Sequence, residues 1–397
     1  MRRVRFYILI LCLTLLPQVV AAADLVRYLR AQGDSRLAAI GLSVPLLLVL
    51  LNLPMAFEVL RRKKKAFALL LQAPWTAWWL GSIFYVLLLG FWSLGAGLVA
   101  LWQQGPHAAM PVWLALSPFA LSLYGTLFGA RVLRRENVTV PVLALPPGWQ
   151  GARIVQLSDL HSGRHITRAR LQRIAERAAR LKPDLLVVTG DIVHNSSAFA
   201  RQAAEAIGSI PTLHGIYACL GNHDFWAGAD AVTSELERAG VQVLRNRGVL
   251  LERNGCGLWL CGVDDPWNGR FDLPAALRGL PAGTPTVLLS HQPNTWPRAQ
   301  ELGVALQLSG HTHGGQLALT WLHRSLSLAR LITPFVSGLY RAGSCYLYVN
   351  RGAGSVMPMV RLGARPEVTV LTLVAPGTSE EPEASDLAKT DLAEAPS

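Results

Sequence analysis

The chain has 397 residues, of which 51% are hydrophobic and 16% are charged. It is long enough for more than one domain and too apolar for an ordinary soluble protein, which indicates a membrane protein. Its net charge of +12 would attract a polyanion, but no RNA- or DNA-binding motif accompanies that charge. Much of the basic excess flanks apolar segments, where it suits anionic lipid headgroups. We therefore expect a membrane as partner and no nucleic acid.

Four apolar runs come first, each near or above the length of a bilayer core, at residues 6–22, 37–60, 73–102 and 109–130. Arginine or lysine precedes the first run, separates the second from the third and follows the fourth, whereas "QQGPHAAMP" between the third and fourth has neither. The positive-inside rule then places the N-terminus and everything after Arg131 in the cytoplasm. The first run also fits a cleavable signal peptide, and both readings stay open. Residues 1–135 are thus predicted to be an all-α, multi-pass region of the inner (cytoplasmic) membrane with about four transmembrane helices.

Residues 136–150 are predicted to be a linker, because "PVLALPPGWQG" is typical of a Pro/Gly connection or an opening strand. A globular domain is expected over residues 151–374. Residues 375–397 are rich in proline, serine, alanine and acid, and are expected to form a disordered acidic tail. The five cysteines are dispersed and give no disulfide framework, in agreement with a reducing compartment.

Within the domain, short apolar runs rich in β-branched residues are typical of buried strands, at "RIVQLS", "LLVVTG", "GIYACL", "TVLLS" and "VALQLS". The segment between the first two has apolar residues at helical spacing from Leu171 to Leu181 and ends at Pro183. "SSAFARQAAEAIGSI" predicts a second helix. The order is therefore β-α-β-α-β, and strands dominate the later part of the domain.

Each of the five predicted strands ends in an acid, amide or imidazole. The ligand-type residues found there are Asp159, His161, Asp191, Asn222, His291, His311 and His313. In an open α/β sheet, ligands bind beyond the carboxyl ends of the strands. A single Asp or His at such a place is usually a cap or a solvated loop residue, but seven together predict a metal site. Carboxylate, amide and imidazole without thiolate suit Mn²⁺, Fe, Zn²⁺ or Ni²⁺. Seven ligands suit two ions about 3.5–4 Å apart that share a carboxylate.

The blocks "DLH", "GD", "GNHD", "SHQP" and "GHTHGGQ", in this order, resemble those of the calcineurin-like metallophosphoesterases. The later "GVDDP" and "VNRGAG" resemble the bacterial branch in which such a domain follows membrane segments. The resemblance implies an α/β fold, a four-layer αββα sandwich. It also implies that one metal is held by Asp159, His161 and His313, the other by Asn222, His291 and His311, and that Asp191 bridges them.

The resemblance further implies a catalytic role for His223, which would donate a proton to the leaving oxygen while metal-activated hydroxide attacks phosphorus. One residue departs from the pattern. In the protein-phosphatase branch an Asp three positions after the bridging Asp orients this histidine, whereas "GDIVH" has His194 there. An imidazole would not raise the pKa of His223 as a carboxylate does, so its strength as an acid stays open and a phosphoprotein substrate is disfavoured.

The leading hypothesis is a membrane-anchored, metal-dependent hydrolase of phosphodiesters or related phosphoesters, with a substrate that could be lipid-linked. The alternative is a UDP-2,3-diacylglucosamine pyrophosphate hydrolase of lipid A synthesis, since some enzymes of that activity resemble this fold. A channel or transporter regulated by the domain is disfavoured, because the apolar runs contain almost no acid or base apart from Glu58.

Overall fold

The computed structural model describes residues 2–31, 65–103, 110–318, 326–356 and 359–377. The chain divides after Gly129 into an N-terminal helical unit and a larger unit that begins at Ala130. The predicted apolar run at residues 37–60 lies outside the described residues, as does most of the predicted tail.

The helical unit contains α1 (Arg2–Ala31), α4 (Lys65–Gln103) and α5 (Val112–Tyr124), which continues as the π-helical turn η1 (Gly125–Gly129). Within the described residues, two stretches are long and apolar enough to cross a membrane, Pro74–Ala96 and Val112–Gly129. α4 and α5 pack closely, because a Cβ on Gly81 would lie 2.5 Å from the Phe119 ring. α1 contacts α4 through a 3.0 Å hydrogen bond from the Tyr85 hydroxyl to Asp24.

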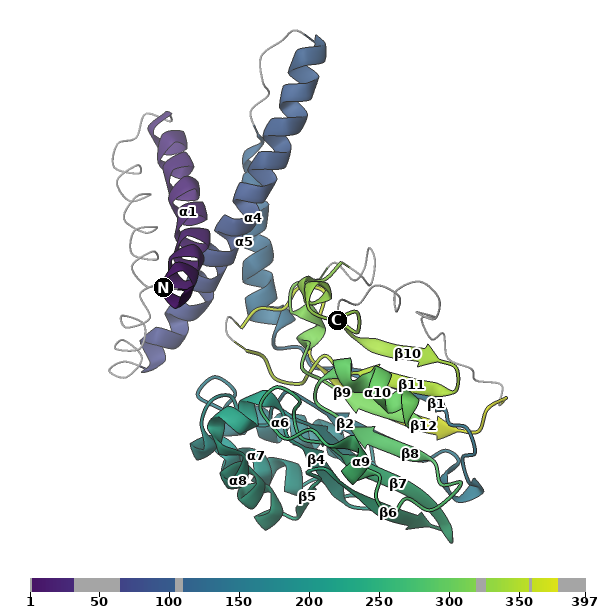
Figure 1. Ribbon diagram of the computed structural model, residues 1–397. Coiled ribbons are helices and arrows are strands. Elements are labelled where there is room, and N and C mark those ends of the chain that lie inside the picture. Colours follow the sequence, from purple (N-terminus) through teal and green to yellow (C-terminus); the bar gives the residue numbers. More distant parts are fainter. Residues whose placement is uncertain (1, 32–64, 104–109, 319–325, 357–358, 378–397) are drawn as a thin grey trace. The chain divides into compact units, whose positions relative to one another are not determined.

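The larger unit is built on two six-stranded mixed sheets (Figure 1). The first has the order β1-β12-β2-β3-β4-β5, with bounds Arg134–Pro141, Glu367–Val374, Arg153–Leu157, Leu185–Thr189, Ile216–Cys219 and Val241–Val243. The second has the order β10-β11-β9-β8-β7-β6, with bounds Gly338–Ala342, Cys345–Val349, Leu306–Ser309, Thr286–Leu289, Cys256–Gly262 and Arg247–Arg253.

A continuous apolar core fills the space between the sheets. Ile154 and Leu185 contribute to it from the first sheet, and Leu260 and Leu308 from the second, all fully buried. Helices cover the outer faces: α6 (Arg168–Ala179), α7 (Ala200–Gly208) and α8 (Asn222–Arg238) on the first sheet, α9 (Leu273–Ala276) and α10 (Trp296–Glu301) on the second. This arrangement confirms the predicted four-layer αββα sandwich.

The domain begins earlier than the sequence predicted. Residues 134–141, divided there between the membrane region and the linker, form strand β1, which pairs in parallel with β12 over eight residues. Val138 and Val140 alternate with polar residues as in a half-buried strand. Pro141 is tolerated because it ends a strand at the edge of the sheet. The proline- and glycine-rich composition that suggested a linker belongs to the turn and the 3-10 helix η2 (Pro147–Trp149) that follow.

The parallel strands β2, β3 and β4 of one sheet and β8 and β9 of the other carry the loops of the predicted site. Two hydrogen bonds join the sheets here, one from Gln156 Nε2 to the Ser309 carbonyl at 3.0 Å and one between His291 Nδ1 and the Thr189 carbonyl at 2.8 Å. The carboxyl ends of both sets of strands therefore meet at one edge of the sandwich.

Candidate metal centre

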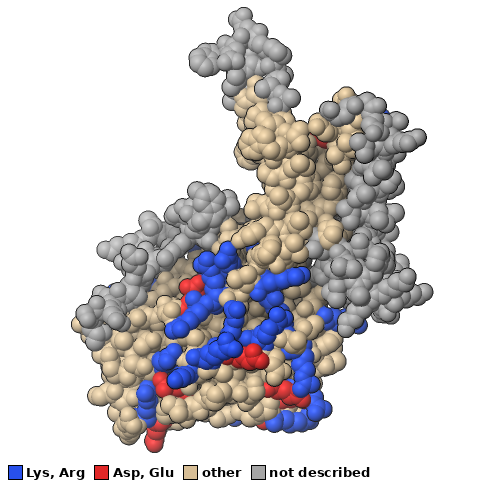
Figure 2. Space-filling view, turned by 180° about the vertical axis from the view of Figure 1, so that it is seen from behind, with Lys and Arg blue, Asp and Glu red and all other residues tan. Residues whose placement is uncertain are grey.

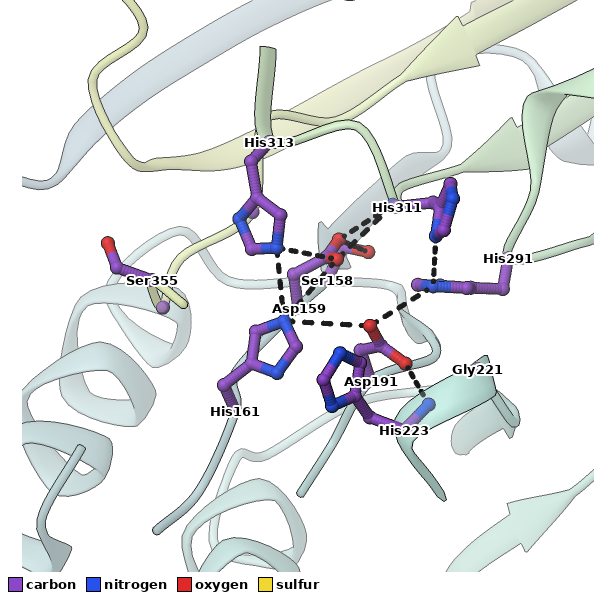
Figure 3. A network of polar contacts seen from close by, with 12 residues as sticks. Ser158, Asp159, His161, Asp191, Gly221, His223, His291, His311, His313 and Ser355 are labelled. Carbon is purple, nitrogen blue, oxygen red and sulfur yellow. Dashed lines mark hydrogen bonds and ion pairs between the residues drawn. The ribbon is translucent and has the colours of Figure 1, made fainter. Parts of the chain in front are cut away.

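The structure brings six of the seven predicted ligands together at this edge (Figure 3). The seventh, Asn222, directly precedes His223, whose backbone nitrogen donates to Oδ1 of Asp191 at 2.9 Å. Each of the seven follows a strand directly: Asp159 and His161 after β2, Asp191 after β3, Asn222 after β4, His291 after β8, and His311 and His313 after β9. Among the described residues, three groups have ligand atoms that all lie within 4.8 Å of one another and could hold a metal ion. Two consist of predicted ligands, Asp159–His161–His313 and Asp191–His291–His311, and the third is His161–His194–His223.

In the first group the ring nitrogens of two histidines converge. Nε2 of His161 lies 3.0 Å from Nε2 of His313. Oδ1 of Asp159 lies 3.4 Å from Nε2 of His313 and 3.8 Å from Nε2 of His161. Three electron-pair donors thus point at one small volume, as in a three-residue metal site.

Asp191 reaches both groups. Its Oδ2 lies 3.3 Å from Nε2 of His291 and 3.5 Å from Nε2 of His161. His311 Nδ1 lies 3.3 Å from the same nitrogen of His291. One carboxylate oxygen therefore stands between the nitrogens of two neighbouring groups, which is the position that a bridging ligand needs.

Asn222 provides an independent test of whether the residues fit a metal. Its side chain is buried, yet its Oδ1 has no hydrogen-bond partner. A buried polar atom without a partner costs about 1–3 kcal/mol, so such an atom calls for a function or an unseen partner. A cation bound by this oxygen would remove the cost.

The backbone of the centre is strained. Five of the seven predicted ligands have positive φ, between 47° and 71°: Asp159, His161, Asp191, His311 and His313. Non-glycine residues rarely adopt this conformation, and it persists only where the surrounding fold enforces it, often at functional sites. Gly190 and Gly221 allow the β3 and β4 loops to touch, because a Cβ on Gly190 would lie 2.7 Å from the Gly221 nitrogen.

Burial keeps three of the histidines neutral at physiological pH. It lowers the pKa of His161 to about 3 and that of His311 to about 4. Burial, together with the nearby Arg361 charge, holds the pKa of His313 well below its usual range. Neutral imidazoles keep the lone pair with which histidine binds metals.

His291 behaves in the opposite way. Burial disfavours its charged form, but the carboxylates of Asp191 and Asp159 outweigh burial and raise its pKa to about 10. Burial also raises the pKa of Asp159, to about 6. The pair of carboxylates thus favours a positive charge at this point, and a cation would supply that charge in place of the proton.

His223, the predicted proton donor, lies at the start of α8 beside Asn222. Its Nδ1 contacts the main-chain carbonyl of His194 and lies 3.1 Å from Oδ1 of Asn195. The two oxygens therefore take the place that an orienting carboxylate would have. The ring of His194 instead stacks on that of His223, with centroids 5.0 Å apart.

Two buried charged residues at the centre escaped the sequence analysis as functional candidates. Asp224 is fully buried and accepts hydrogen bonds from the backbone nitrogens of Gly221, Ile192 and Val193 at 2.9–3.2 Å, which ties the β4 loop to the β3 loop. Arg361 is 1% exposed, and its Nη2 lies 2.9 Å from Nδ1 of His313. A lone arginine in the apolar "PMVRLGA" was the available signal.

Comparisons with known proteins agree on one family. Residues 152–315 match the calcineurin-like phosphoesterase family. The chain is 34% identical over 268 residues to a transmembrane protein with metallophosphoesterase domain from Danio rerio, covering 64% of this chain and 60% of that protein. It is 33% identical to the uncharacterized metallophosphoesterase YkuE of Bacillus subtilis (strain 168), covering 65% of this chain and 93% of that protein. It is 32% identical to phosphodiesterase YaeI of Escherichia coli (strain K12), covering 56% of this chain and 82% of that protein.

Proposed function

The chain belongs to the calcineurin-like phosphoesterase family, and we propose that it is a membrane-anchored hydrolase that cleaves phosphodiester or related phosphoester bonds with two divalent cations. The observation that carries this proposal is the position of Asp191, whose Oδ2 lies within 3.5 Å of nitrogens from both ligand groups. Asp159, His161 and His313 would hold one cation, and Asn222, His291 and His311 the other. Mn²⁺, Fe, Zn²⁺ and Ni²⁺ all suit this donor set.

When bound, the cations lower the pKa of water and neutralise phosphate oxygens, the chemistry of two-metal hydrolysis. The chain's own contribution is to orient and to move a proton. With Nδ1 of His223 directed at the His194 carbonyl and Asn195 Oδ1, that nitrogen carries a hydrogen. In the protonated ring Nε2 carries the second hydrogen, which it would donate to the leaving oxygen. Asp224 fixes the loop from which His223 projects.

Anchoring is supported by the apolar helices and by a basic surface at the start of the domain. Figure 2 shows lysine and arginine side chains gathered on one face of this unit. The exposed arginines here lie just before β1, at its start, in α6 and directly after α6; they are Arg131, Arg134, Arg135, Arg168, Arg173, Arg177 and Arg180.

α6 is held against the segment that follows the last apolar helix. Arg170 Nη2 donates to the Ala130 carbonyl at 2.7 Å and Arg177 Nη1 to the Leu133 carbonyl at 2.6 Å. Because Ala130 follows Gly129 directly in the sequence, the segment bound by α6 comes immediately after a candidate membrane span along the chain. Positive charge there favours the cytoplasmic leaflet with its anionic lipids, and an amphiphilic, lipid-linked phosphoester would reach a site anchored in this way.

The decisive experiment uses the full chain in detergent, stripped of metal by a chelator and reloaded with Mn²⁺. Turnover of an aryl phosphodiester and an aryl phosphomonoester is compared with that of Asp191→Asn. Glu301→Gln makes the same chemical change on an exposed carboxylate and is the matched control. We expect metal-dependent diester turnover in the wild type and the control that is lost in Asp191→Asn. Turnover that survives both chelation and Asp191→Asn would exclude the proposed centre.

A further inference from the structure

Two tryptophans that the proposed chemistry does not use border the metal centre. Trp226 and Trp267 are each 58% exposed. The ring centroids of Trp226 and His223 are 4.5 Å apart, with the rings tilted. Those of Trp267 and His311 are 5.0 Å apart, with the rings edge to face. Each indole therefore contacts a histidine of the site and leaves more than half of its surface to solvent.

Hydrogen bonds hold the indole of Trp226 and the backbone of Trp267 in place. Trp226 Nε1 donates to Oδ1 of Asn268 at 2.8 Å. Oδ1 of the buried Asp265 accepts from the backbone nitrogens of Trp267 and Asn268, both at 3.0 Å, and so shapes the loop after β7. Its Oδ2 accepts from Nε2 of Gln292 at 2.7 Å, next to the predicted ligand His291.

The loop that carries Trp267 also packs directly on α8. A Cβ on Gly269 would lie 2.6 Å from the Phe225 ring and 2.8 Å from the Asp264 Cβ, so only glycine permits this approach. Phe225 directly precedes Trp226. The two tryptophans thus belong to elements that are fixed both to each other and to the ligand loops, and not to independent surface loops.

Exposed aromatic side chains that are fixed beside a reactive centre are typical of binding sites, because their faces offer a large apolar area at small entropic cost. A planar ring stacks on an indole face more favourably than a puckered ring of similar size, because only the planar ring brings its whole face into contact. The two positions, one beside His223 and one beside His311, are where the organic part of a bound phosphoester would lie.

We propose that Trp226 and Trp267 form an aromatic platform that binds a planar ring of the substrate, an aryl group or a nucleobase, beside the phosphoryl group. This inference rests on the proposed function for the identity of the phosphoester. Recognition of the ring is a binding property of the platform, so it is measured without turnover.

The test is calorimetric titration of the full-length, Mn²⁺-loaded protein in detergent with phosphonates, whose P–C bond resists hydrolysis. Phenylphosphonate and cyclohexylphosphonate are compared at a pH where both are dianionic, so that they differ mainly in ring planarity. The phosphonate analogues of thymidine 5′-monophosphate and of 2-deoxyribose 5-phosphate, in which a methylene group replaces the ester oxygen, distinguish a nucleobase from a simple aryl ring. We expect the planar member of at least one pair to bind roughly five- to a hundredfold more tightly, the range for one ring stacked on an aromatic side chain.

The variants assign this preference to the two indoles. Trp226→Ala and Trp267→Ala should each bring the ratio of dissociation constants toward one, and Trp226→Phe and Trp267→Phe should retain most of it. Leu213→Ala removes an exposed apolar side chain of the same unit, 75% exposed, and should leave the ratio unchanged. A wild-type ratio near one in both pairs, or a ratio that both alanine variants preserve, would overturn the platform.

Failure of the platform and failure of the proposed function give different results. If diester turnover is metal-dependent but the planar ligands have no advantage, the hydrolase proposal stands and the platform does not. If the planar ligands bind preferentially through the two tryptophans but no ester is turned over, the platform stands and the hydrolase proposal does not.

Discussion

The space between the two sheets and the edge where they meet are built from the same strands. They differ in the polarity of their side chains and in their backbone conformation. Between the sheets, side chains such as Leu260 and Leu308 are apolar and fully buried. Three residues beyond Leu308 the same strand delivers His311, which has a φ of 71° and faces two carboxylates. One segment thus contributes first to stability and then to a strained, polar site.

This difference shows that the core supplies the stability with which the edge is held in an unfavourable conformation. Left-handed backbone at non-glycine residues costs of order 1–3 kcal/mol each, and five predicted ligands have it. A buried oxygen without a partner, on Asn222, adds to the cost. A substitution at the edge should therefore lower turnover with little loss of stability, and a substitution in the core should lower stability with little loss of turnover.

The largest effect is expected at the edge. His311→Ala removes a predicted ligand, and catalysis should fall by more than about a hundredfold, the upper end for residues that only support a ligand. The free energy of unfolding of the metal-free protein should change by about 1 kcal/mol or less. Diester turnover and urea denaturation measure the two quantities. A large loss of stability with turnover preserved would contradict the separation.

Leu308→Ala tests the core on the same strand. Truncating a fully buried leucine leaves a cavity, and we expect the free energy of unfolding to fall by about 2–5 kcal/mol. The turnover of the molecules that remain folded should stay close to that of the wild type. If turnover per folded molecule fell as far as in His311→Ala, the core and the edge would not be independent.

Removal of metal should destabilise the wild type by mass action. At a free Mn²⁺ concentration about a hundred times the dissociation constant, binding stabilises the folded state by about 2.7 kcal/mol. Chelation should therefore lower the melting temperature of the wild type and hardly change that of Asp191→Asn. Differential scanning calorimetry with and without chelator measures this shift, and equal shifts in the two proteins would argue against the shared carboxylate.

A smaller effect is expected at the residues that orient His223. Asn195→Ala removes one of the two oxygens near Nδ1, and a single hydrogen bond of this kind contributes about 0.5–1.5 kcal/mol. Turnover should fall severalfold, with little change in the affinity for Mn²⁺. His194→Ala keeps the carbonyl and serves as the matched variant; a larger loss there would assign the role to the imidazole.

The smallest effect is expected at a surface ion pair away from both regions. Arg298 and Glu301 lie 2.5 Å apart with side chains 53% and 62% exposed. Such pairs contribute less than about 1 kcal/mol. Arg298→Ala should therefore leave both the free energy of unfolding and turnover within error of the wild type. A measurable change in either would show that the two assays also respond to changes outside the core and the metal centre.

Much of the fold and the place of the candidate site could be predicted, because both depend on local signals. Apolar β-branched runs such as "LLVVT" predict buried strands, and parallel strands deliver their following residues to one edge. Asp159, Asp191 and His291 are therefore close in space although they are far apart in the sequence. Their role as metal ligands stays a prediction.

Other features depend on contacts between segments that are far apart in the sequence, and local sequence patterns do not predict such contacts. β1 was hidden because this edge strand is half-polar, and only β12, more than two hundred residues later, makes it a strand. Asp224 and Arg361 were missed for the same reason, since their roles arise from contacts with Ile192 and His313 in distant segments. The positive φ of the ligands is likewise a property of the assembled edge.

The strand order β1-β12-β2 also has a consequence for synthesis. The last of the described strands to be made, Glu367–Val374, inserts between the first two. Until it emerges from the ribosome, β1 and β2 each expose an unpaired edge, while the apolar helices before them have already been made. We therefore expect the first sheet to close only after synthesis of the domain is nearly complete. A chain that ends before Glu367 would keep its apolar helices and present open, aggregation-prone strand edges.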